Sequence, residues 1–152
     1  MSLQNHVMTA LKEAMKSKDQ TALTALRAVK SAILLAQTET GAKAELTEEQ
    51  ELKILQKQVK QRKDSAAIYL EQGREDLAAP ELAEAEVIAQ FLPEALSEEA
   101  IEKIVVKTIE QTGATGMKDM GKVMGIVSKA LAGQADGKTI STIVRARLTQ
   151  NN

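Results

Sequence analysis

Apolar residues recur three or four positions apart along most of the chain, which is the spacing of the buried face of an α-helix. The pattern predicts seven helices, approximately over residues 3–17, 20–40, 48–72, 76–92, 98–112, 117–132 and 137–148. No run alternates between apolar and polar residues as a half-buried strand does. We therefore expect an all-α protein.

Several predicted helix ends carry residues that terminate helices by a known mechanism. Thr47 and Gln50 have the spacing of a capping box, and Ser97 and Asp136 are placed to cap the helices that follow them. Glycine, which readily adopts the left-handed conformation found after a helix, follows three of the segments: Gly41, Gly73 and Gly113. These signals fix the predicted ends independently of the apolar pattern.

The two prolines bear on how the chain is divided. Pro93 ends the fourth helix, and the segment 92–97 is the best boundary between domains. We expect an N-terminal helical bundle over residues 1–93 and a small three-helix domain over residues 94–152. Pro80 is expected either to begin the fourth helix at its first turn or to split it.

The most informative stretch is the predicted helix over residues 117–132. Lys118, Lys122 and Lys129 fall close to one line on it, with Gly125 inside this row and Gly121 beside it. The opposite face is apolar and consists of Met117, Met120, Val123, Met124, Val127, Ala130 and Leu131. The segment therefore has a core face and a cationic face.

A glycine inside a helix lowers stability by roughly 1 kcal/mol relative to alanine. Such a position commonly serves close packing or the approach of a ligand to bare backbone. Bare backbone among cations suits an anionic polymer lying against the helix. The alternative is that Gly121 and Gly125 seat a neighbouring helix and that the lysines are simply solvated.

Charge and composition narrow the class of partner. Residues 114–152 carry a net charge of +4, whereas the rest of the chain carries −5, so anionic partners are the first candidates for the C-terminal part. Lys138 adds a cation at a predicted helix N-terminus, although Asp136 already occupies the positive end of that helix. Only 1% of the 152 residues are aromatic, which argues against modules that stack nucleic-acid bases on aromatic rings.

The sequence offers few residues that could act together in catalysis. His6 is the only histidine, it lies near the N-terminus, and no nucleophile is spaced to pair with it. The glutamates gather at helix starts and on solvent faces, where they favour the helix dipole, and there is no cysteine. We expect no catalytic residues, no metal site and no cofactor. We also expect no membrane segment and no secretory signal.

Two arginines fall on predicted apolar faces. Arg62 is expected to form an internal ion pair with an acid of the first or the fourth helix, the alternative being a contact with a partner. Arg147 lies close enough to the end of the last helix to extend its guanidinium into solvent.

Several segments together resemble the GatB/YqeY family over nearly the whole chain. In the C-terminal part they are Asp119–Gly125, Gly133–Lys138, Ile143–Val144 and Leu148; in the N-terminal part they are Met15–Asp19, Leu26–Lys30, Gln61–Ser65 and Phe91–Glu94. The C-terminal part resembles the tail domain of the GatB subunit of tRNA-dependent amidotransferase. The N-terminal part resembles the stand-alone relative, YqeY.

The resemblance implies a role beside tRNA and not a complete enzyme. In the amidotransferase the tail domain helps to hold tRNA, while a separate core performs glutamine-dependent amide transfer, and nothing in this chain resembles that core. The resemblance therefore implies that a description of this chain as a carbon–nitrogen ligase would come from the family and not from chemistry that the chain performs alone. We expect a cytoplasmic, non-catalytic module of translation that binds tRNA through Lys118, Lys122, Lys129, Lys138, Gly121 and Gly125.

Two other functions remain open at this point. The first is a protein adaptor that docks to a synthetase or an amidotransferase subunit through the cations Arg27, Lys30, Lys53, Lys57 and Lys60. The second is an autonomous enzyme, which requires a set of side chains that the sequence does not offer.

Overall fold

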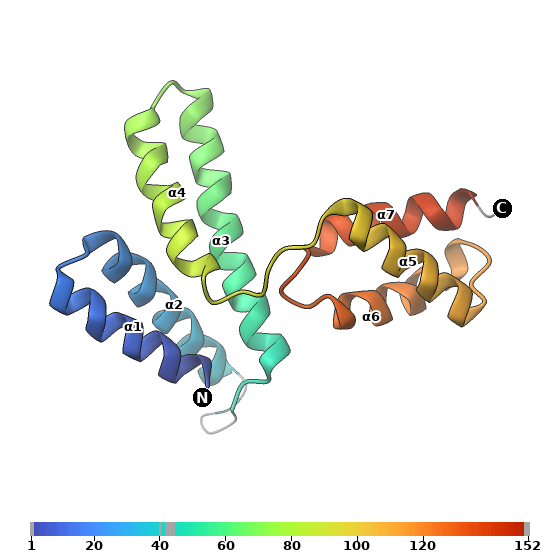
Figure 1. Cartoon of the computed structure of the whole chain (residues 1–152), viewed down its shortest axis with the longest axis horizontal. Helices are drawn as coiled ribbons and strands as arrows, with labels where there is room; N and C mark the ends of the chain where they lie inside the picture. Colours follow the sequence, from blue (N-terminus) through green and yellow to red (C-terminus); the bar gives the residue numbers. More distant parts are fainter. Residues whose placement is uncertain (1, 40, 42–44, 151–152) are drawn as a thin grey trace. The chain divides into compact units, whose positions relative to one another are not determined.

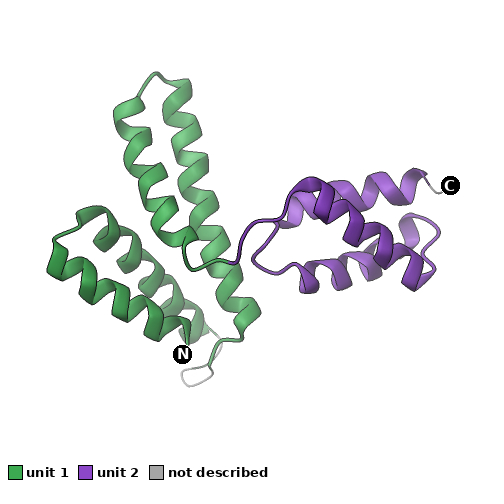
Figure 2. Ribbon diagram, in the orientation of Figure 1, with its two compact units in different colours: residues 1–92 green, residues 93–152 purple. Residues whose placement is uncertain are grey.

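The computed structural model describes residues 2–39, 41 and 45–150. These residues form seven α-helices and one short 3₁₀-helix, and no strand occurs among them. The expected all-α fold class is confirmed. The chain divides into two compact units, residues 1–92 and residues 93–152 (Figure 2).

The first unit consists of two antiparallel helix pairs. Helix α1 (Leu3–Ser17) lies beside α2 (Gln20–Glu39), and α3 (Glu48–Glu71) forms a long hairpin with α4 (Glu75–Ala89), as Figure 1 shows. Helix α2 packs against both α3 and α4 and so joins the two pairs. The core between them includes the fully buried side chains of Val7, Leu26, Val29, Leu55 and Ile88.

The second unit is a three-helix bundle made of α5 (Glu98–Thr112), α6 (Met120–Ala130) and α7 (Gly137–Gln150). Each of the three helices contacts the other two. Their shared core contains Ile101, Val105, Val123, Val127, Ile140, Val144 and Leu148. The short 3₁₀-helix η1 (Met117–Asp119) precedes α6 directly.

The capping residues act as their types predict. The Thr47 hydroxyl accepts a hydrogen bond from the Gln50 N–H at 3.2 Å, and the Gln50 side chain accepts one from the Thr47 N–H at 2.9 Å, which completes the capping box. Ser97 accepts a bond from the Ala100 N–H at the start of α5. Gly113 ends α5 with a φ of 68°, a left-handed conformation that costs glycine little.

Pro80 neither begins nor splits its helix, so both expectations for it are wrong. Helix α4 starts at Glu75 and continues through Pro80 to Ala89. Proline at this position removes a single backbone hydrogen bond, the one to the carbonyl of Asp76, near the exposed start of the helix. Packing of the later residues Ala85 and Ile88 against the rest of the unit holds α4 together in spite of that loss.

The predicted helix over residues 117–132 is also corrected. Its first turn is the 3₁₀-helix η1, in which the Asp119 N–H donates to the Gly116 carbonyl, and α6 ends at Ala130. Met117 and Ala130, both assigned to the apolar face, are exposed instead. Leu34 on α2 and Leu70 on α3, which lie at helical spacing from the apolar residues of those helices, are 49% and 50% exposed.

Candidate nucleic-acid interface

Helix α6 is held in the second unit by one face only. Val123, Val127 and Leu131 are buried among α5 and α7, and Met120 and Met124 are half-buried beside them. The remaining surface of the helix faces solvent. The pattern of apolar residues thus fixes which side of α6 a partner can reach.

That open side of α6 carries Lys122 and Lys129, and Lys118 lies just before the helix. Lys118 in η1 and Lys122 and Lys129 in α6 are all exposed, and none of them forms an ion pair with any residue that the structure describes. Lys122 and Lys129 are two turns apart, which places them about 10 Å from each other along the helix axis. We call Lys118, Lys122 and Lys129 the lysine row.

The two glycines lie on the same open side of the helix. Both are exposed, and a Cβ atom built on Gly121 or Gly125 would have no neighbouring atom within 4 Å. The alternative that they seat a neighbouring helix is therefore wrong for the described part of the chain. Their bare backbone is accessible from outside.

Ile126 belongs to this surface and was not anticipated from the sequence. It follows Lys122 by one helical turn and precedes Lys129 by one turn, and 43% of its surface is exposed. An exposed apolar residue that stands next to buried ones in the sequence gives little signal of its own. Its position adds an apolar contact to the middle of the lysine row.

Asp119 places a negative charge beside the same row. Its carboxylate accepts a hydrogen bond from the Thr115 N–H at 3.0 Å. That bond, followed by the proximity of Lys118, the Gly116 N–H and Lys122, lowers the pKa of Asp119 below its ordinary value. Asp119 therefore stays ionised and reduces the net positive potential at this end of the row.

Lys138 is exposed but lies on another helix. Asp136 caps α7 by accepting a hydrogen bond from the Thr139 N–H at 2.6 Å, and Lys138 is the second residue of that helix. Because a short turn joins α6 to α7, Lys138 is at the turn end of α7, whereas Lys118, in η1, precedes the opposite end of α6. The structure therefore unites Lys122 and Lys129 with the glycines, and leaves Lys138 at one edge.

The cations of the first unit are only partly available. Lys53 pairs with Glu49 at 3.3 Å and Lys60 pairs with Asp64 at 2.6 Å, each one turn away on α3. Two of the three lysines predicted on this helix, Lys53 and Lys60, are thus paired with acids. Arg27 and Lys30 on α2 are exposed and have no such pair among the described residues.

Arg62 is half-buried between polar groups of its own helix and the neighbouring one. Its Nη1 donates to the Gln58 carbonyl at 3.2 Å and to Gln58 Oε1 at 2.7 Å, and no direct ion pair forms within the described chain. The expected ion pair is thus replaced by a bond to an amide. Arg62 acts electrostatically on Glu84 of α4. Burial raises the pKa of Glu84, while the positive charge of Arg62 opposes the rise.

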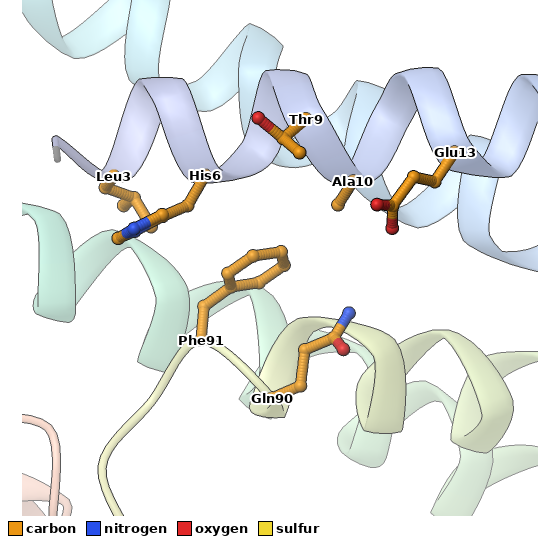
Figure 3. A pocket seen from close by; sticks show the side chains of 7 residues that line it. All are labelled: Leu3, His6, Thr9, Ala10, Glu13, Gln90 and Phe91. Carbon is orange, nitrogen blue, oxygen red and sulfur yellow. The ribbon is translucent and has the colours of Figure 1, made fainter.

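A concave site in the first unit contains the only histidine. It has a volume of about 420 Å³ and lies between α1, which supplies His6, Thr9 and Glu13, and the segment that follows α4. Figure 3 shows the ring of Phe91 pointing toward α1. The Thr9 hydroxyl donates to the Asn5 carbonyl at 2.9 Å, so its proton is engaged with the backbone and not with a side-chain base.

The described residues contain neither a cluster of metal ligands nor a membrane-spanning helix. Across residues 2–39, 41 and 45–150 there is no group of three or more histidine or acidic side chains placed to hold a metal ion. In the same ranges no helix combines the length and the apolar character that crossing a bilayer requires.

Comparison with known proteins now assigns the family. The family described as "Yqey-like protein" matches residues 4–148. The chain belongs to this family. The match includes both units of this YqeY-like protein, and it confirms the resemblance drawn from the sequence segments.

Named relatives of this YqeY-like protein fall into two groups. One is a glutamyl-tRNA(Gln) amidotransferase subunit of Thermococcus gammatolerans, 37% identical over 75 residues that make up 47% of this chain and 12% of that subunit. The others are two proteins named "Altered inheritance of mitochondria protein 41, mitochondrial". The one from Clavispora lusitaniae is 40% identical over 62% of this chain and 55% of its own length.

The second of these, from Pyrenophora tritici-repentis, is 32% identical over 82% of this chain and 68% of its own length. This YqeY-like chain therefore spans about an eighth of the amidotransferase subunit and just over half of the first mitochondrial relative.

Proposed function

We propose that this YqeY-like protein is a non-catalytic module that binds the folded body of tRNA through the lysine row. The observation that carries the proposal is the open side of α6, where the unpaired Lys122 and Lys129 border two glycines whose backbone is accessible, with the unpaired Lys118 in η1 just before the helix. Ammonium groups attract phosphates, and glycines allow a bulky polymer to approach the helix closely. Lys138 would contact a phosphate at the edge of this surface.

The ligand class follows from what the surface contains and what it lacks. The described residues hold two aromatic side chains, Tyr69 and Phe91, and both belong to the first unit, whereas the lysine row belongs to the second. Base stacking is therefore not the mode of binding, and contacts to the phosphate backbone of a folded RNA fit better. The family connection to an amidotransferase that is named for glutamyl-tRNA(Gln) makes tRNA the first RNA to test.

The absence of catalysis is part of the proposal. The chain matches only 12% of the amidotransferase subunit, so most of that subunit has no counterpart here. In the concave site around His6 the Thr9 hydroxyl donates to a backbone carbonyl and not to a side-chain base. We expect the purified chain to show no glutamine-dependent amide transfer to misacylated tRNA, and measurable transfer would contradict this part of the proposal.

A filter-binding titration with bulk tRNA tests the RNA interface. The double variant Lys122→Glu/Lys129→Glu is expected to bind at least about tenfold more weakly than the unaltered protein near 100 mM salt. The slope of log affinity against log salt should also fall by about one to two, since two phosphate contacts are lost.

The matched control changes the same charge on another helix of the same unit. Lys103 and Lys107 are exposed on α5, and neither forms an ion pair within the described residues. Lys103→Glu/Lys107→Glu should retain most of the affinity. Equal losses in the two double variants, or binding that is independent of salt, would reject the lysine row as the interface.

The cellular site of action follows from the ligand. A tRNA-binding module of translation is expected in the cytoplasm, and fractionation of cells that express the tagged chain checks this. Two relatives carry the word mitochondrial in their names, so an organellar fraction is the informative alternative result.

A further inference from the structure

A groove between α1 and α2 in the first unit is not explained by RNA binding. It has a volume of about 190 Å³. The buried side chains of Val7 and Ile33 form its floor, and Met8, Gln4, Lys30 and Leu34 line its sides. Leu34 is 49% exposed, so an apolar side chain of the rim faces solvent.

The border of the groove is cationic. Arg27, Lys30 and Leu34 follow one another at intervals of three and four residues, so they share one side of α2. Lys12 follows Met8 by one turn on α1, which places a third cation on the α1 side. All three cations are exposed, and within the described ranges none of them has an acidic partner.

We propose that this groove binds an acidic amphipathic helix of a partner protein. An apolar side chain of that helix would lie between Met8 and Leu34, and its carboxylates would meet Lys30, Arg27 and Lys12. Two antiparallel helices present a groove into which a third helix packs in the ordinary way. The uncompensated positive border selects a negatively charged occupant, because like charges on the partner would be repelled.

RNA is a poorer occupant of the same groove. Phosphates would gain from the cations but nothing from the apolar floor, and no aromatic side chain lines the groove for base stacking. The two activities therefore use different units, with the helix groove in residues 1–92 and the lysine row in residues 93–152. Failure of one proposal leaves the other standing.

The probe is a pair of synthetic helical peptides of about 18 residues, or five turns. Both carry leucine at positions i, i+3, i+4 and i+7 along one face; the acidic peptide has glutamate and the basic peptide has lysine at four positions flanking that face, and alanine and glutamine fill the rest so that both stay helical. Fluorescence anisotropy of the labelled peptides against the full chain reports binding. We expect saturable binding of the acidic peptide and at least about tenfold weaker binding of the basic one.

Two neighbouring leucines provide a matched pair of variants. Leu34→Asp should weaken binding of the acidic peptide at least about tenfold, because it places a charge in the apolar contact. Leu35 is 62% exposed and does not line the groove, so Leu35→Asp should change the affinity less than about twofold. Both positions are exposed, and circular dichroism verifies that both variants keep the fold.

A charge swap makes the test decisive. Arg27→Glu/Lys30→Glu should lose the acidic peptide and gain the basic one, which a damaged fold would not do. Three results would overturn the proposal: no saturable binding of the acidic peptide to the unaltered chain, equal effects of Leu34→Asp and Leu35→Asp, or displacement of the acidic peptide by tRNA. Concentration-dependent dimerisation that Leu34→Asp abolishes would also overturn it, by identifying a second copy of the chain as the occupant.

Discussion

Arg147 on α7 donates from both Nε and Nη2 to a single carboxylate oxygen of Glu102 on α5, with the Nε bond at 2.9 Å. The two residues are far apart in the chain, so this ion pair links the last helix of the second unit to its first. As expected, the Arg147 side chain reaches the surface, where it is 38% exposed; its ion pair with Glu102 was not anticipated. Its guanidinium remains at the surface but is fixed in direction by Glu102.

The strength of this link can be measured with a double-mutant cycle. Both side chains are more than one-third exposed, so solvent screens the pair. We expect a coupling free energy of about 0.5 to 1 kcal/mol between Arg147→Met and Glu102→Gln in urea unfolding. High salt should reduce the coupling, and a value near zero would show that the pair adds nothing to stability.

Substitution of the α6 glycines by alanine should change stability and tRNA binding in opposite directions. Gly121→Ala and Gly125→Ala are each expected to raise the free energy of unfolding by about 0.5 to 1 kcal/mol, because the added methyl meets no neighbour and alanine favours the helix. The same changes should weaken tRNA binding in the filter assay, since the methyl group occupies the approach to the backbone.

Gly113 provides the control for these substitutions. Its added Cβ would also meet open space, but its φ of 68° is unfavourable for alanine. Gly113→Ala should therefore lower stability by about 1 kcal/mol and leave tRNA affinity unchanged. If Gly121→Ala and Gly125→Ala stabilise the protein and bind tRNA normally, the glycines are not part of the interface.

Replacement of Pro80 should stabilise α4. Alanine restores an N–H donor for the Asp76 carbonyl and removes the steric conflict of the ring, and we expect a gain of about 1 to 3 kcal/mol. Greater freedom of the unfolded chain offsets part of this gain. Urea unfolding of Pro80→Ala measures the balance, and a loss of stability would mean that the proline's effect on the unfolded state dominates.

Glu84 should make stability depend on pH. Burial raises its pKa above 4.5, Arg62 opposes the rise, and Glu81 adds to it. The native state then holds the proton more tightly than the unfolded state, so ionisation of Glu84 weakens the fold as the pH rises through the raised pKa. Glu84→Gln should therefore be more stable than the unaltered protein at pH 7.

That difference should disappear in acid. Near pH 3, well below the ordinary pKa of 4.5, the carboxyl group is protonated in both the folded and the unfolded state, and it resembles the neutral amide. Thermal unfolding of the unaltered protein and of Glu84→Gln between pH 3 and 7 should show the two stabilities converging as the pH falls. Glu86→Gln, on an exposed position of the same helix, is the control, and a stability difference that persists at low pH would have a cause other than ionisation.

Local features of the sequence predicted the helices well because their signals act over a few residues. The capping box of Thr47 and Gln50 and the caps Ser97 and Asp136 satisfy N–H groups only one turn away, so no distant partner has to be known. The family was likewise found from short segments that the comparison then confirmed.

The sequence by itself determined that the chain is helical, where most helices begin, and which residues could form a cationic row. The tertiary structure alone decided that Pro80 lies inside a helix, that Leu34 remains exposed beside a groove, and that Arg147 meets Glu102. Each of these depends on which helices pack together and how far their contact extends. Periodicity shows that a helix has an apolar face, but only the packed neighbours determine how much of that face is covered.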